Sequence, residues 1–188
     1  IRDSCEMCIR DRNIGEHLNL SAGLEANYYI GAHYKQLEDI LGAEYWLDID
    51  QFSERDFKMD KDKLQNDIDN PNRKIYVGDK FGFNYDLVNT SANVWGLLQW
   101  SFPKLDFYTG LSAGLGQNWR VGYMRNGRMP DNSLGTSEKL SSNQFSFKLG
   151  STYKVSGRHF VVANGAYMSR PTLLRDTYIS PRNGDTPV

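Results

Sequence analysis

Both cysteines of the chain lie close to its beginning, at Cys5 and Cys8. Their Cys-x-x-Cys spacing is found in redox centres and in zinc sites. A zinc site needs two further ligands at suitable spacing, and neither a second cysteine pair nor a His-x₃₋₅-His pattern follows. A redox centre of this kind needs a strand–helix–strand context, which the surrounding residues do not show. We therefore expect no metal and no redox cofactor at this pair.

A second candidate is the segment 110–114, which reads Gly-Leu-Ser-Ala-Gly and matches the G-x-S-x-G pattern around a nucleophilic serine. That chemistry needs a sharp turn from a strand into a helix, which exposes the serine. Here the five residues lie inside a segment of alternating apolar and polar residues, and no helical pattern follows. The better interpretation is a strand of small residues.

The remaining candidates are three histidines and four aspartates: His17, His33, His159, Asp60, Asp62, Asp67 and Asp69. No histidine has a second one four residues away or a glutamate in the H-E-x-x-H arrangement of zinc proteases. The aspartates lack the glycine at position six and the glutamate at position twelve of a calcium-binding loop. We interpret the aspartates as a solvated loop, and we predict that the protein is not an enzyme and uses no cofactor.

The composition fits one folded domain. The chain has 188 residues, of which 24% are charged and 13% aromatic, so it is not of the disordered type. A net charge of −1 argues against binding to nucleic acid through electrostatic attraction. No run of eighteen apolar residues occurs, which is the length that a transmembrane helix needs.

The strongest pattern is a strict alternation between residues 16 and 35. Nine successive even positions are apolar: Leu18, Leu20, Ala22, Leu24, Ala26, Tyr28, Ile30, Ala32 and Tyr34. A period of two predicts a β-strand with one apolar face and one polar face. Strands in soluble proteins are commonly five or six residues long, whereas a tilted strand that crosses a bilayer needs about nine to eleven and often continues beyond it. We therefore predict a transmembrane strand of an outer-membrane barrel.

The alternation recurs along the chain. It predicts strands near 16–35, 79–102, 105–124, 140–155 and 159–169, with extracellular loops at 36–76, 125–139 and 170–188. The apolar phase shifts between Leu87 and Ala92, which predicts a β-bulge, and helical spacing over 37–45 predicts a short helix. The fold class is all-β: an antiparallel up-and-down meander of about five long strands, forming an incomplete piece of a large transmembrane β-barrel.

The connections predict an orientation. Short turns at Pro103 and Gly157 alternate with long loops, as short periplasmic turns alternate with long extracellular loops in bacterial barrels. On the strand near 105–124, Phe107 and Trp119 are twelve residues apart. At a tilt near 45° this separation gives roughly 28 Å of height, close to the distance between the two aromatic girdles of a barrel.

The polar face must look inward in such a barrel. Glu25 and Lys148 lie in the middle of polar faces, and a lysine at the lipid midplane would cost about 2–4 kcal/mol. Glycines gather on the same face: Gly23, Gly31, Gly110, Gly114 and Gly116. Bare backbone lets another body approach closely, so we predict that something fills the lumen.

Residues 1–12, IRDSCEMCIRDR, do not share the alternation. They resemble translated adaptor-derived ends of assembled reading frames, so we expect them to be non-native and leave them out of the predicted fold. Without a start methionine or a signal peptide, the chain is expected to be truncated, and residues 13–188 are expected to be the partial barrel.

Residues 143–185 resemble a strand, turn, strand and extracellular loop of TonB-dependent outer-membrane receptors. The likeness is carried by Thr152-Tyr153-Lys154, Ser156-Gly157-Arg158-His159, Ala163-Asn164-Gly165-Ala166-Tyr167 and Ile179-Ser180-Pro181-Arg182. The resemblance implies a plugged barrel of about twenty-two strands in the Gram-negative outer membrane, importing a scarce nutrient of the siderophore, cobalamin or glycan class. Its implied partners are outer-membrane lipid, a small nutrient ligand and a TonB-type periplasmic energy-transducing protein, with the plug domain absent from this chain. No ligand-binding residue carries over.

Two alternatives remain at this point. The first is a porin-like or other outer-membrane barrel, which the presence or absence of an upstream plug would distinguish. The second is a soluble β-sandwich that binds carbohydrate through its tryptophans: Trp46, Trp95, Trp100 and Trp119. A sandwich would have short strands with turns every eight to twelve residues, and the length of the alternating segments argues against it.

Overall fold

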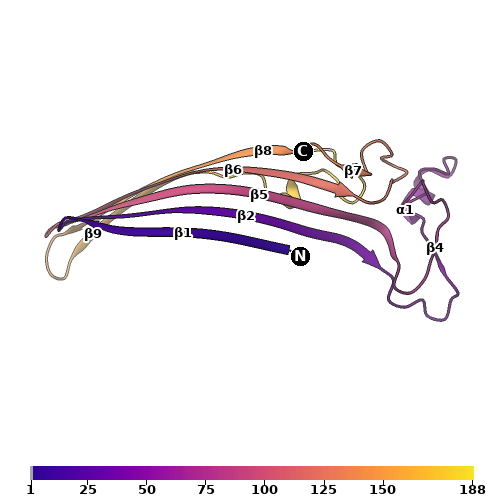
Figure 1. The fold of residues 1–188 in the computed structure, drawn as a ribbon, viewed down its shortest axis with the longest axis horizontal. Coiled ribbons are helices and arrows are strands. Elements are labelled where there is room, and N and C mark those ends of the chain that lie inside the picture. The colour runs from indigo at the N-terminus through magenta and orange to yellow at the C-terminus, as the bar shows by residue number, and fades with distance from the viewer. Residues whose placement is uncertain (1) are drawn as a thin grey trace.

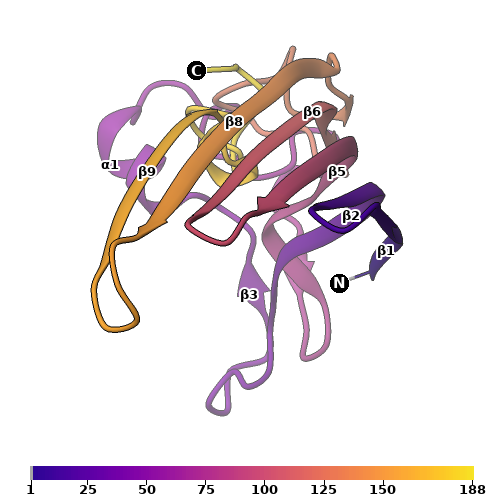
Figure 2. The same cartoon turned by 90° about the vertical axis from the view of Figure 1, so that its left-hand side faces the viewer.

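One long antiparallel sheet dominates the computed structural model, which describes residues 2–188. Its main strands are β1 (Arg2–Ile14), β2 (Leu18–Gln36), β5 (Lys80–Ser101), β6 (Leu105–Gly122), β8 (Leu140–Lys154) and β9 (Phe160–Ser169). Each pairs with the next in the order β1-β2-β5-β6-β8-β9, and the short β7 (Gly135–Thr136) adds to β6. This confirms the predicted all-β antiparallel meander. The sheet bends into a long arc and stays open, with β1 and β9 as its edges (Figures 1 and 2).

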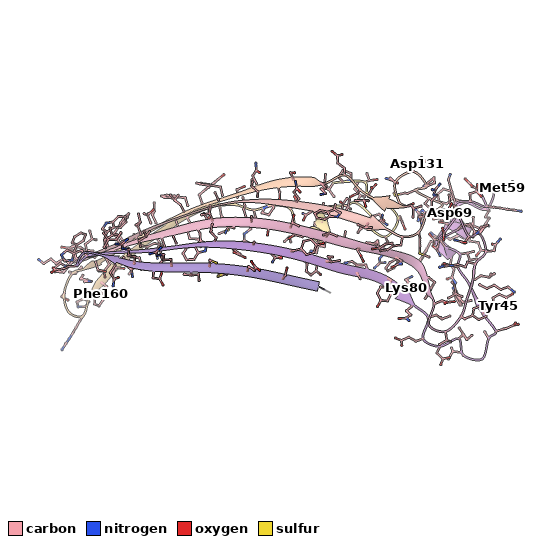
Figure 3. All side chains as sticks on the ribbon, in the orientation of Figure 1. Tyr45, Met59, Asp69, Lys80, Asp131 and Phe160 are labelled. Carbon is pink, nitrogen blue, oxygen red and sulfur yellow. The ribbon has the colours of Figure 1, made fainter. Side chains whose placement is uncertain are left out.

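The connections between strands lie at two opposite ends of the sheet. The turn end holds three short connections, residues 15–17, 102–104 and 155–159, and the loop end holds the segments 37–79, 123–139 and 170–188. Figure 3 shows this separation, with Tyr45, Met59 and Asp69 at the loop end and Phe160 at the turn end. The loop end also carries a two-stranded sheet of β3 (Trp46–Leu47) and β4 (Lys74–Ile75), the helix α1 (Gln51–Asp56) and the 3₁₀ turn η1 (Leu174–Asp176). No helix within residues 2–188 is long and apolar enough to cross a membrane.

The helix lies elsewhere than the sequence predicts. Residues 37–45 form turns and irregular chain, and Leu41 has a φ of 51°, a left-handed conformation that interrupts a right-handed helix. The helix begins after Asp50 instead. The Asp50 side chain accepts hydrogen bonds from the backbone N–H groups of Phe52 and Ser53, which is the usual role of aspartate before the first helical turn.

The predicted bulge between Leu87 and Ala92 is wrong. The pairing of β2 with β5 runs without interruption from Tyr34 opposite Asn84 to Leu18 opposite Trp100, and its only register shift falls between Tyr34 and Lys35. The apolar phase changes for another reason. Near the loop end the polar side of β5 is covered by the C-terminal segment, so apolar residues are buried on that side.

Residues 2–14 form a sixth long strand, although the sequence prediction left residues 1–12 out of the fold. An exposed strand edge presents unpaired N–H and C=O groups that bind any suitable extended chain, and β1 occupies that edge of β2. The register places Glu6 opposite Ala26 and Arg10 opposite Ala22. Because directly opposite residues share a face, these charges lie on the apolar side of β2. The expectation that residues 1–12 are non-native stays a prediction.

Candidate functional site

The pairing register divides the sheet into two faces of different chemistry, because cross-strand neighbours point to the same side. The apolar face carries large side chains that stay exposed in the described chain: Leu24, Val94, Leu111, Leu115, Phe145, Leu149 and Tyr153. Leu115 is 67% exposed and Leu24 is 60% exposed. Soluble monomers rarely expose a continuous apolar surface of more than a few hundred Å². Larger exposed apolar surfaces are typical of proteins that bind another protein or a membrane.

The opposite face, called the polar face below, carries the side chains that alternate with these. Glu25 lies opposite Asn93, and Lys148 lies opposite Gly110. Hydrogen bonds cross between strands on this face: Ser112 Oγ and Ser146 Oγ are 2.6 Å apart, and Asn89 Nδ2 donates to Asn118 Oδ1 at 2.6 Å. Glu25 and Lys148 therefore lie on the polar face, as their places in the sequence predict.

The glycines of the polar face are covered by side chains of the same sheet. A Cβ at Gly23 would collide with the Trp95 ring, and one at Gly150 would collide with Tyr108. Gly23 is directly opposite Trp95, and Gly150 is directly opposite Tyr108. Each ring thus occupies the space where the side chain of the opposite glycine would lie, an arrangement that compensates the strand for the missing side chain. That a separate body also packs on this face stays a prediction.

Aromatic side chains border the apolar face at both ends. At the turn end, the rings of Trp100 and Phe107 lie 5.4 Å apart. At the loop end, Lys80 Nζ lies 4.0 Å from the centre of the Tyr34 ring and Lys139 Nζ lies 4.8 Å from the centre of the Trp119 ring. Aromatic residues together with long cationic ones are typical of the borders of a lipid-facing surface.

At the loop end, Asp48 organises the long segment 37–79. Its side chain is 1% exposed and forms an ion pair with Arg73, with Nη2 and Oδ2 2.6 Å apart. The same carboxylate accepts hydrogen bonds from Asn66 Nδ2 at 2.8 Å and from the backbone N–H of Gly82 at 2.8 Å. Through Asp48 the loop is therefore attached to the start of β5.

A small core attaches the C-terminal segment to the polar face. Tyr178 is buried against Tyr85 and Leu87 of β5, and its hydroxyl lies 2.9 Å from Ser137 Oγ. Burial raises the pKa of the Tyr178 hydroxyl. Arg120 of β6 is 3% exposed. It donates to the carbonyl oxygens of Pro181 and Ser133, each at 2.7 Å, and so joins two loop segments to the sheet.

Between these loops lies a pocket of about 370 Å³, a size within the usual range of small-molecule sites. Its walls come from the end of β2, the start of β5, helix α1 and the segments 123–139 and 170–188. The pocket combines the rings of Trp46, Phe52 and Phe83 with charged groups. The sequence did not predict this site, because the residues that line it are far apart along the chain.

The residues first considered for chemistry do not come together. Ser112 is inside β6 and contacts Ser146, with no helix after it. Cys5 and Cys8 are free and exposed, and a spacing of three along a strand directs them to opposite faces. His17 lies at the turn end with Nδ1 2.9 Å from the Ser101 carbonyl oxygen, while His33 stacks on Tyr85. No group of three or more side chains suited to a metal occurs within residues 2–188.

No protein-family model, no curated protein and no solved structure matches the chain. The resemblance to TonB-dependent receptors therefore stays a prediction from the residues that carry it.

Proposed function

We propose that this chain forms part of the wall of an outer-membrane β-barrel of the TonB-dependent receptor type, which imports a scarce nutrient with energy from a periplasmic partner. The observation that carries the proposal is the uncovered apolar face, which continues across β2, β5, β6 and β8 while the other face stays polar. A bilayer is the surrounding that matches an apolar face of this extent. Aromatic residues at both borders of the face support the same assignment.

In the proposed orientation, the loop end faces the outside of the cell and the turn end faces the periplasm. The support is the difference in connection length between the two ends, because bacterial barrels have long external loops and short periplasmic turns. The polar face then lines the lumen, with Glu25 and Lys148 away from lipid.

Cysteine labelling tests this proposal. After Cys5 and Cys8 are changed to serine, single cysteines are placed at Met59 in the loop end, where the side chain is 98% exposed, and at Gly157 in the turn end. In intact cells of a Gram-negative host that present the protein, a membrane-impermeant maleimide is expected to label Met59→Cys but not Gly157→Cys. Permeabilising the outer membrane is expected to make both reactive. Labelling of both sites in intact cells would contradict the orientation.

The other candidates gain less support. A porin-like barrel has the same kind of wall, and the residues that resemble TonB-dependent receptors favour the receptor. A sandwich that binds carbohydrate would present its tryptophans together. Here Trp95 lies on the polar face, whereas Trp100 and Trp119 lie on the apolar face, near opposite ends of the sheet.

A further inference from the structure

We propose that the loop-end pocket binds a small anionic ligand through Lys35 and Arg182, with an apolar or ring-shaped part of the ligand packing on the pocket's aromatic side chains. The assignment rests on the proposed import function, since it names the class of ligand that this end would admit. The anionic group of the ligand would be a carboxylate or a phosphate. A guanidinium such as that of Arg182 can donate two parallel hydrogen bonds to either group.

The charges of the pocket are unequal. Lys35, Arg128 and Arg182 line it against a single carboxylate, Asp50. That carboxylate already accepts hydrogen bonds from the first turn of α1, and it lies 3.8 Å from Arg128 Nη1. One positive and one negative charge thus compensate each other. Lys35 and Arg182 are left as the uncompensated charges of the site.

Lys35 and Arg182 both approach the ring of Phe83. Lys35 Nζ lies 5.5 Å from the centre of the Phe83 ring, and Arg182 Cζ lies 5.2 Å from the same centre. Among residues 2–188, neither side chain has an ion pair or donates a hydrogen bond, whereas other loop cations such as Arg73 and Arg125 do pair with carboxylates. An anion that reaches both side chains would supply the negative charge that the pocket lacks.

The aromatic walls indicate the rest of the ligand. Trp46 is 43% exposed and Phe52 is 70% exposed, and both line the pocket. Exposed rings beside uncompensated cations suit a ligand with an anionic group attached to an apolar or planar body. Lys35 and Arg182 are also exposed, so such a ligand can reach them from solvent.

Calorimetric titration of the whole chain in detergent tests the assignment, with phthalate and phenyl phosphate as anionic probes and benzyl alcohol as the neutral control. We expect at least one anion to bind and the alcohol not to bind, with affinity falling as salt is added. The anion that binds more tightly shows whether carboxylate or phosphate is preferred. Absence of binding by both anions, or equal binding of the alcohol, would overturn the proposal.

Substitutions of the two pocket cations test whether the anion binds in this pocket. Arg182→Gln and Lys35→Gln are each expected to weaken anion binding roughly ten- to a hundredfold, the effect of losing a charged hydrogen bond. The matched control is Arg175→Gln, which removes the same charge from the same segment at a side chain that is 81% exposed and paired with Asp176. Affinity is expected to stay unchanged in that control. Equal losses in the control and in both pocket variants would contradict the site.

The same wild-type sample is mixed with phospholipid vesicles and floated on a density gradient. If the protein floats with the vesicles but binds neither anion, the proposed ligand class is wrong, while the proposed contact with lipid still holds. If the protein does not float with the vesicles, the proposal that it forms part of a barrel wall in the membrane is contradicted.

Discussion

Asp48 shows how one buried carboxylate determines the shape of a long loop. It contacts Arg73 from one end of segment 37–79, Asn66 from the middle and the backbone of Gly82 in β5. A loop of this length usually has a functional role or is disordered. Here it is ordered because a charged group that is taken out of water must find several partners, and those partners come from separate places in the loop.

Replacing Asp48 with alanine is therefore expected to open this loop locally. The change leaves Arg73 without its partner, and we expect a local cost of about 2–4 kcal/mol, reduced from that of a fully buried pair because Arg73 is partly exposed. Hydrogen exchange of the amides in residues 46–75 measures this opening. Asp56→Ala is the matched control, since Asp56 forms a solvent-exposed pair with Arg55, and exposed pairs contribute little to stability. Equal exchange in the two variants would show that Asp48 does not hold the loop.

At the scale of a strand, β6 separates the two faces most clearly. Leu111 is 53% exposed and lies on the apolar face between Gly96 and Phe147, whereas the adjacent Ser112 lies on the polar face beside Ser146. Under the proposed function, Leu111 faces lipid and Ser112 faces the lumen.

Leu111 and Ser112 are expected to respond differently to substitution by arginine. Leu111→Arg is expected to lower the free energy of unfolding in lipid vesicles by about 2–4 kcal/mol, because the charge is placed in the hydrocarbon layer. Ser112→Arg loses only its hydrogen bond to Ser146 and is expected to cost about 0.5–1.5 kcal/mol. Denaturant titration of both variants measures the difference. Equal destabilisation would argue against a lipid-facing Leu111.

The long strands could be predicted from sequence because alternation is a local property of the chain. The ends of β2, β5, β6, β8 and β9 fall within two residues of those expected. The apolar phase of β5 does change, but the bulge predicted from it is wrong, because Tyr85 and Leu87 are buried by Tyr178, which is distant in sequence. The loop-end pocket could not be predicted for the same reason: Lys35, Phe83 and Arg182 meet only when three segments fold together.

The whole molecule is an open, curved sheet with loops gathered at one end (Figure 1). Its described residues bury few large apolar side chains, and many large apolar side chains on the apolar face of the sheet stay exposed. A soluble domain is stabilised by apolar side chains buried inside it, whereas a membrane wall is surrounded by lipid. β1 is the exception, because its register places charged residues, among them Glu6, Arg10 and Arg12, on the apolar side. That residues 1–12 are non-native stays a prediction.

The central claim is that the apolar face contacts lipid, and a spin-label scan of β6 tests it most directly. With Cys5 and Cys8 changed to serine, nitroxide labels are placed one at a time at residues 110–116 of the protein in lipid vesicles. Collision with oxygen, which concentrates in the bilayer, is expected to peak at the odd positions 111, 113 and 115. Collision with a water-soluble nickel chelate is expected to peak at the even positions. Equal access along the strand, or peaks with the opposite phase, would contradict the account.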